Sequence, residues 1–79
     1  MILSSHRKRL LYQATHRGTK EADLLLGGYV QQHILSFSET DLTHLEEVLT
    51  LDDEKIVASI LGQSSTHAFL SKIRTFYEK

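Results

Sequence analysis

The sequence of 79 residues contains no cysteine, no proline and no tryptophan. Without cysteine, the chain can form neither a disulfide nor a cysteine-ligated zinc site. No apolar run approaches the roughly 18 residues that a membrane span requires. The basic N-terminus lacks the apolar core and the small-residue cleavage site of a secretory signal. These absences predict no direct membrane insertion and a cytoplasmic location.

The length and composition predict one small folded domain over residues 1–79. Hydrophobic residues make up 41% of the chain and charged residues 24%, which is typical of a globular domain and not of a disordered tail. Apolar residues recur at helical spacing without proline, and neither strand-like alternation nor an Asn-Gly turn is present. The expected fold class is therefore all-α, a compact monomeric bundle of about five short helices.

The net charge of −1 hides three blocks of charge. Residues 1–20 carry five cations and no acid, whereas residues 21–54 carry nine acids and neither Lys nor Arg. Residues 55–79 carry four cations and one acid. Blocks of this kind say more about binding partners than about the fold.

Capping residues and apolar spacing predict where each helix begins and ends. Ser38 and Asp41 resemble a capping box, and Phe37 with Leu42 forms a candidate hydrophobic staple. The expected helices are residues 5–16, residues 19–34 with Thr19 as the cap, one beginning after Ser38, one from near Thr50 to Gly62, and one after a cap at Ser65 or Thr66.

The pattern also predicts which faces of the last two helices are buried. The residues expected to face inward are Ile56, Val57, Ile60, Leu61, Phe69, Ile73, Phe76 and Tyr77, whereas Lys72, Arg74 and Lys79 are expected to face outward. Gly27 and Gly28 interrupt the second helical pattern, where each costs roughly 1 kcal/mol relative to Ala. Either the backbone packs closely against a neighbour there or the helix kinks.

Catalysis and metal binding find little support in the sequence. The adjacent acids at 46–47 and 52–53 diverge on a helix and are interpreted as solvated or first-turn residues. A small bundle leaves little room for a ligand pocket. The five histidines show no pair at the three- or four-residue spacing of a helical metal site. We expect a chain that is not an enzyme and has no cofactor or metal of its own.

A nucleic-acid-binding function is the alternative that the basic N-terminus suggests. Arg7, Lys8 and Arg9, followed by Arg17 and Lys20, could contact phosphates. The nine acids of the middle block and a pI near 6.5 oppose this interpretation. A generic helical interaction domain fits the composition equally well.

Residues 17–23 read Arg-Gly-Thr-Lys-Glu-Ala-Asp and join two predicted helices. Arg17 can complement the end of the first helix, Gly18 can close it, and Thr19 can cap the next. Glu21 and Asp23 then lie in a first turn, where the helix dipole favours acids. We expect an exposed corner with charges of both signs, which suits the binding of another protein.

This Arg-Gly-x-x-Glu segment, after a basic helix and with an acid two positions later, resembles the succinate dehydrogenase assembly factors of the bacterial SdhE type. The similarity extends over residues 9–12, 17–25, 35–39 and 49–62. Two departures concern the fourth helix. The family often has Asp-Pro there, whereas Asp53 is followed by Glu54, and Ser59 lies near the place of a family tryptophan.

The resemblance implies a five-helix assembly chaperone that binds the flavoprotein subunit of succinate dehydrogenase or of fumarate reductase. It implies that the chain promotes covalent attachment of FAD to a histidine of that subunit. Arg17, Gly18 and Glu21 carry over as partner-binding residues, together with Arg9 and Asp23, which match the family less closely. A side chain at position 18 is expected to clash with the helix cap or with the partner. The alternative is a nucleic-acid-binding or antitoxin-like regulatory module.

Overall fold

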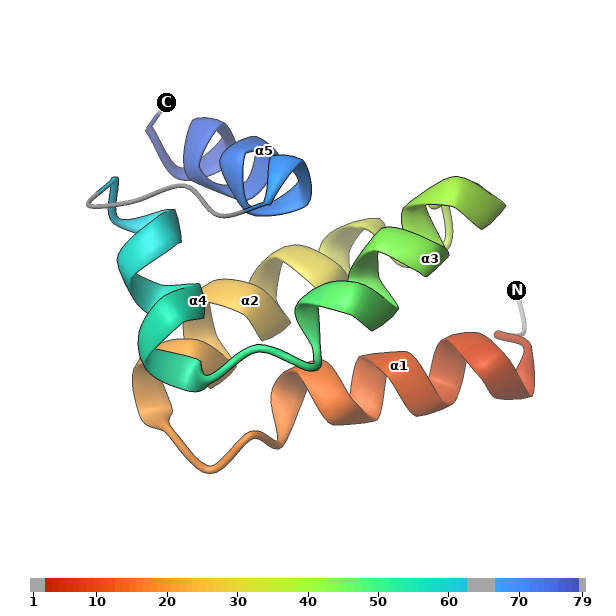
Figure 1. Cartoon of the computed structure of the whole chain (residues 1–79). Coiled ribbons are helices and arrows are strands. Elements are labelled where there is room, and N and C mark those ends of the chain that lie inside the picture. Colours follow the sequence, from red (N-terminus) through yellow and green to blue (C-terminus); the bar gives the residue numbers. More distant parts are fainter. Residues whose placement is uncertain (1–2, 63–66, 79) are drawn as a thin grey trace.

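The computed structural model describes residues 3–62 and 67–78, and these residues form five helices without a strand (Figure 1). The helices are α1 (Ser5–Thr15), α2 (Lys20–His33), α3 (Glu39–Val48), α4 (Asp53–Ile60) and α5 (Ala68–Tyr77). The predicted all-α bundle of five short helices is confirmed. None of the helices in the described ranges is both long enough and apolar enough to cross a bilayer.

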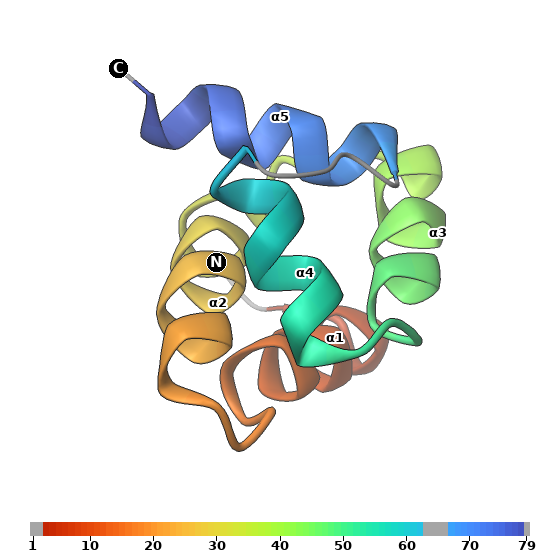
Figure 2. The same cartoon turned by 60° about the vertical axis from the view of Figure 1, so that its left-hand side comes forward.

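The helices pack around one apolar core. Figure 2 shows α4 between α2 and α3, with α5 across the top and α1 below. Helix α1 packs against α2 and α3, and α4 packs against α2 and α5. Buried apolar side chains of all five helices and of the α2–α3 connection meet in this core: Leu10, Ala14, Leu26, Val30, Ile34, Phe37, Leu42, Leu45, Val48, Ile56, Ile60, Phe69, Leu70 and Ile73.

Local capping explains several of the helix starts. The hydroxyl of Ser4 accepts a hydrogen bond from the backbone N–H of Arg7 at the start of α1. Ser38 and Asp41 form the predicted capping box at the start of α3. Helix α5 is capped by His67, whose Nδ1 accepts from the N–H of Phe69. The caps predicted at positions 65 and 66 lie outside the described residues.

Two predictions for α4 are wrong. The helix begins at Asp53 and not near Thr50, because the N–H groups of Thr50 and Leu51 bond back to α3 carbonyls and complete its last turn. Leu61 does not face the core but is 60% exposed, since α4 ends one residue before it.

A prediction for α5 is also wrong. Tyr77 is predicted to face inward but is exposed, although its hydroxyl donates to an α2 carbonyl.

The two adjacent glycines of α2 mark close packing. A Cβ on Gly27 would lie 2.9 Å from Cγ2 of Thr15 and 3.0 Å from the carbonyl oxygen of Ala14. A Cβ on Gly28 would lie 3.0 Å from the hydroxyl of Tyr77. Of the two explanations offered for these glycines, the close approach is confirmed, and it sets α1 directly against α2.

Candidate functional site

The side chain of Arg17 points inward from the α1–α2 loop, toward the turn between α3 and α4. Its Nη1 donates to the carbonyl oxygen of Leu49 at 3.1 Å, and its Nη2 donates to that of Leu51 at 2.6 Å. Its Nε lies 2.5 Å from Oδ1 of Asp53. The side chain is only 15% exposed. Arg17 therefore binds the C-cap carbonyl of α3 and a carbonyl of the α3–α4 turn, and it pairs with the first residue of α4.

Asp53 is held by two residues of the α1–α2 loop. While Oδ1 accepts from Arg17, Oδ2 accepts from the hydroxyl of Thr19 at 2.6 Å. The hydrogen bonds from Thr19 and Arg17 lower the pKa of Asp53, so the carboxylate stays ionised. Thr19 occupies the N-cap position of α2, as predicted, but its side chain makes no cap bond, and its hydroxyl donates to Asp53.

Asp23, in the first turn of α2, binds the backbone of the α1–α2 loop. Its Oδ1 accepts from the backbone N–H of Arg17 at 2.7 Å. Between them, Gly18 has a φ of +96°, a conformation that L side chains rarely adopt. A Cβ on Gly18 would meet no atom within 4 Å, so within the chain the predicted clash is wrong and backbone conformation is what selects glycine.

We call Arg17, Thr19, Asp23 and Asp53 the Arg17 clasp. It corrects the predicted corner, because two of the charges expected to be exposed there are turned into the chain. Asp53 lies in the first turn of α4, one of the two placements expected for the adjacent acids, and it is also engaged by the clasp. The other predicted site residues, Arg9, Gly18 and Glu21, are exposed.

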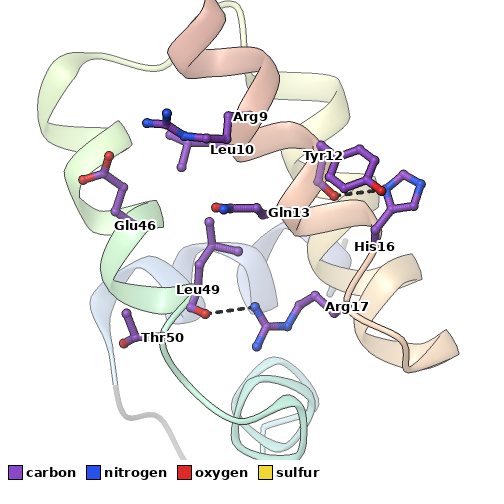
Figure 3. A pocket seen from close by; sticks show the side chains of 9 residues that line it. All are labelled: Arg9, Leu10, Tyr12, Gln13, His16, Arg17, Glu46, Leu49 and Thr50. Carbon is purple, nitrogen blue, oxygen red and sulfur yellow. Dashed lines mark hydrogen bonds between the residues drawn. The ribbon is translucent and has the colours of Figure 1, made fainter.

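Two open grooves flank the clasp, although the sequence predicted little room for a pocket. The first, of about 620 Å³, lies between α1 and the end of α3, and Figure 3 shows its lining side chains. At one end, Tyr12 stacks on His16 with ring centroids 4.0 Å apart. At the other end lie Arg9 and Glu46. We call it the α1–α3 groove, and it is lined by Arg9, Leu10, Tyr12, Gln13, His16, Arg17, Glu46, Leu49 and Thr50.

The second groove, of about 470 Å³, lies between the first turn of α2 and helix α4. We call it the α2–α4 groove, and it is lined by Thr19, Glu21, Asp53, Glu54, Val57, Ala58 and Leu61. Arg17 lines the first groove and its partner Asp53 lines the second. The ion pair of the clasp thus forms part of the wall between the two grooves.

Arg7 is a second inward-turned arginine, although the sequence predicted it on a basic surface. Its Nη1 donates to the carbonyl oxygen of Ile34 at 2.5 Å, and its Nη2 donates to that of Phe37 at 2.9 Å. Arg7 therefore caps the end of α2 much as Arg17 caps the end of α3. Among the basic residues of the first block, Lys8, Arg9 and Lys20 stay exposed.

His6 and His67 each pair with a glutamate, and the ring of His67 also packs edge-on against that of His44, with ring centroids 5.5 Å apart. His6 lies 2.5 Å from Glu46 and His67 lies 2.7 Å from Glu47. Within residues 3–62 and 67–78, no group of three or more His, Asp or Glu side chains is arranged to hold a metal ion.

Comparisons with known proteins identify the family. The family model described as flavinator of succinate dehydrogenase matches residues 8–77. The chain is 34% identical over 61 residues to FAD assembly factor SdhE of Acetobacter pasteurianus, covering 77% of this chain and 56% of that protein. It is 36% identical over 47 residues to the mitochondrial succinate dehydrogenase assembly factor 2 of Caenorhabditis elegans, covering 60% of this chain and 40% of that protein.

A mitochondrial succinate dehydrogenase assembly factor 2 from Candida glabrata is also 36% identical over 47 residues, covering 60% of this chain and 31% of that protein. The chain thus spans little more than half the length of these relatives, or less. No solved structure matches it significantly. Since the family model covers nearly the whole chain, the predicted resemblance is confirmed, and the chain belongs to the family of flavinators of succinate dehydrogenase.

Proposed function

We propose that this chain binds the flavoprotein subunit of succinate dehydrogenase and promotes the covalent attachment of FAD to it. The observation that carries the proposal is the family match over residues 8–77. The names of the bacterial and mitochondrial relatives, which describe FAD assembly and succinate dehydrogenase assembly, point the same way.

The geometry supports a division of labour within residues 17–23. Arg17 and Asp23 bond within the chain and hold the loop in one conformation. Gly18 and Glu21 remain exposed on that fixed loop. A preorganised loop loses little conformational freedom when it binds, which favours affinity. We therefore propose that Gly18 and Glu21 contact the partner directly, together with the exposed Arg9 of α1.

The proposed mechanism is non-enzymatic. The chain selects a conformation of the flavoprotein in which the flavin and the accepting histidine can react, and it shifts the population toward that conformation. The chemistry of the new bond belongs to the flavin and to that histidine. On this proposal the chain has no cofactor of its own, acts as a monomer, and works in the cytoplasm.

A nucleic-acid-binding function is less well supported by the geometry. Arg7 and Arg17 donate to backbone carbonyls, and this leaves Lys8, Arg9 and Lys20 as the exposed cations of the first block. A small number of phosphate contacts gives weak and strongly salt-dependent binding.

Fumarate reductase is a second proposed client, because the resemblance also implies binding to its flavoprotein subunit.

The test is to express the flavoprotein subunit in cells that lack an endogenous assembly factor, with and without this chain. Covalent flavin is measured by its fluorescence in a denaturing gel, and complex formation is measured by co-purification. We expect flavin fluorescence only where the chain is present, and much less with Glu21→Ala. Equal flavinylation with and without the chain would refute the proposal.

A further inference from the structure

The α2–α4 groove has an apolar floor that the bundle leaves uncovered. Val57 and Ala58 of α4, and Leu61 directly after its last residue, contribute three apolar side chains. Leu61 is 60% exposed, and Val57 and Ala58 are half-buried. Figure 2 shows α2 and α4 side by side, with the first turns of both helices at the same end. An uncovered leucine beside two half-buried apolar residues offers contact area to an apolar side chain from outside.

The rim of the same groove is acidic. Of the seven described residues that line the groove, three are acids and none is a lysine or an arginine. Asp53 is already engaged by Arg17 and Thr19. Glu21 and Glu54, in contrast, make no ion pair or hydrogen bond with any described residue. Two uncompensated carboxylates therefore face the groove from the first turns of two helices.

We propose that the α2–α4 groove is a docking site for a basic segment of the client flavoprotein, with an aliphatic or aromatic side chain on Leu61 and a Lys or Arg between Glu21 and Glu54. The inference rests on the proposed function for the identity of the client. Charge complementarity selects this occupant, because an acidic segment would meet two unpaired carboxylates at the rim. It adds Glu54 and Val57 of α4, and Leu61 directly after this helix, to a binding surface that the sequence predicted only within residues 9–23.

The proposal predicts both an apolar and a salt-dependent contribution to binding. Affinity for the purified flavoprotein subunit is measured by titration calorimetry at low and high salt. Leu61→Ser is compared with Leu35→Ser, an exposed leucine outside the groove. We expect Leu61→Ser to weaken binding on the order of tenfold and Leu35→Ser to leave it unchanged.

The electrostatic part is tested with neutral variants. Glu54→Gln is compared with Glu39→Gln, an exposed first-turn acid of α3 outside the groove. We expect wild-type affinity to fall as salt rises, and Glu54→Gln to weaken binding and flatten that dependence, whereas Glu39→Gln behaves as wild type. Thermal unfolding verifies that all four variants stay folded.

The possible outcomes separate the two proposals. If the wild-type chain binds the flavoprotein and promotes flavinylation while both groove variants behave as their controls, the groove proposal is wrong and the proposed function stands. If the wild-type chain does not bind the flavoprotein at all, both proposals fail. If sedimentation shows a dimer that Leu61→Ser dissociates, the groove is occupied by a second copy, and the proposed occupant is wrong.

Discussion

Nε of Arg17 lies 2.5 Å from Oδ1 of Asp53, although the two residues are 36 positions apart in the sequence. This pair joins the α1–α2 loop to the start of α4, and the remaining Arg17 donors bind the C-cap carbonyl of α3 and a carbonyl of the turn that follows it. One side chain therefore joins three helix termini. Because Arg17 bonds within the chain, replacing it can reduce function by destabilising the fold. Replacing Glu21, which makes no such bonds, cannot act in this way.

Replacing Arg17 with Ala should destabilise the fold. The variant loses three side-chain hydrogen bonds, and the carboxylate of Asp53 loses its ion-pair partner. Because one hydrogen bond to a charged group contributes about 1.5–3 kcal/mol, we expect the free energy of unfolding to fall by about 2–3 kcal/mol. Urea unfolding followed by circular dichroism measures the change. Arg9→Ala, an exposed arginine of α1, is the matched control and should change stability by less than about 0.5 kcal/mol.

A double-mutant cycle tests the cause of that loss. Arg17→Ala, Asp53→Ala and the double variant should be strongly non-additive, with a coupling of about 1–3 kcal/mol, because both single variants remove the same contact. Additive losses would contradict the clasp as an energetic unit.

Glu21→Gln should separate function from stability. The Glu21 side chain is exposed and bonds to no described residue, so the free energy of unfolding of its neutral variant should match wild type within about 0.5 kcal/mol. On the proposed function, covalent flavin in the client should nevertheless fall severalfold, as measured by in-gel fluorescence. A Glu21→Gln variant that flavinylates as well as wild type would remove Glu21 from the binding surface.

Acid should weaken the fold through Asp41 and Asp53. Hydrogen bonds from Ser38 lower the pKa of Asp41, and hydrogen bonds from Thr19 and Arg17 lower the pKa of Asp53. A carboxyl whose folded-state pKa lies below its unfolded value of about 3.9 stabilises the fold fully above that value. This contribution is lost as the pH falls through the folded-state pKa.

We therefore expect the free energy of unfolding to decline below about pH 4, with wild type losing more than either Asp41→Asn or Asp53→Asn over that range. Urea unfolding at a series of pH values measures the slopes. A wild-type slope no steeper than that of Asp53→Asn would show that the carboxylate of Asp53 is not stabilised by the clasp.

The features that could be predicted from the sequence are local ones. The capping box of Ser38 and Asp41 joins residues three apart, so the pattern of neighbouring residues contains all the information it needs. The apolar periodicity likewise identifies the buried residues Ile56 and Ile60 of α4 and Phe69 and Ile73 of α5. These features are decided within one or two helical turns.

The clasp could not be predicted in this way, because its partners are distant in sequence. The first-turn position of Asp53 is recognisable, but nothing nearby indicates that Arg17 and Thr19 will bond to it. The wrong start of α4 has a local cause. Thr50 is a good capping residue, yet the N–H groups of Thr50 and Leu51 complete the last turn of α3, and this turn stays outside α4. The carbonyl of Leu51 also accepts from Arg17, a contact that the local pattern does not predict.

The fold should require glycine at position 18 because of its backbone conformation, and not because a side chain there would clash with a neighbour. With a φ of +96° and no atom within 4 Å of an added Cβ, Gly18→Ala should cost about 1–2 kcal/mol through strain alone. Asn tolerates positive φ better than β-branched residues, so the predicted order of stability is Gly, Asn, Ala, Val. Thermal unfolding of the four proteins measures it. Equal stability of Asn and Val at this position would argue against backbone strain.

Replacement of Gly27 should also destabilise the fold, but through steric contact with α1 and not through backbone strain. A Cβ at Gly27 would lie 2.9 Å from Cγ2 of Thr15, so Gly27→Ala should destabilise the fold by about 1–3 kcal/mol. Thr15→Ser removes that methyl group and keeps the hydroxyl that donates to the carbonyl of Leu11. It should therefore restore part of the loss in the double variant, but not all of it, since the carbonyl oxygen of Ala14 would still lie 3.0 Å from the new Cβ. Urea unfolding of the two single variants and the double variant gives the coupling energy, and a coupling of zero would mean that α1 and α2 separate to accommodate the methyl group.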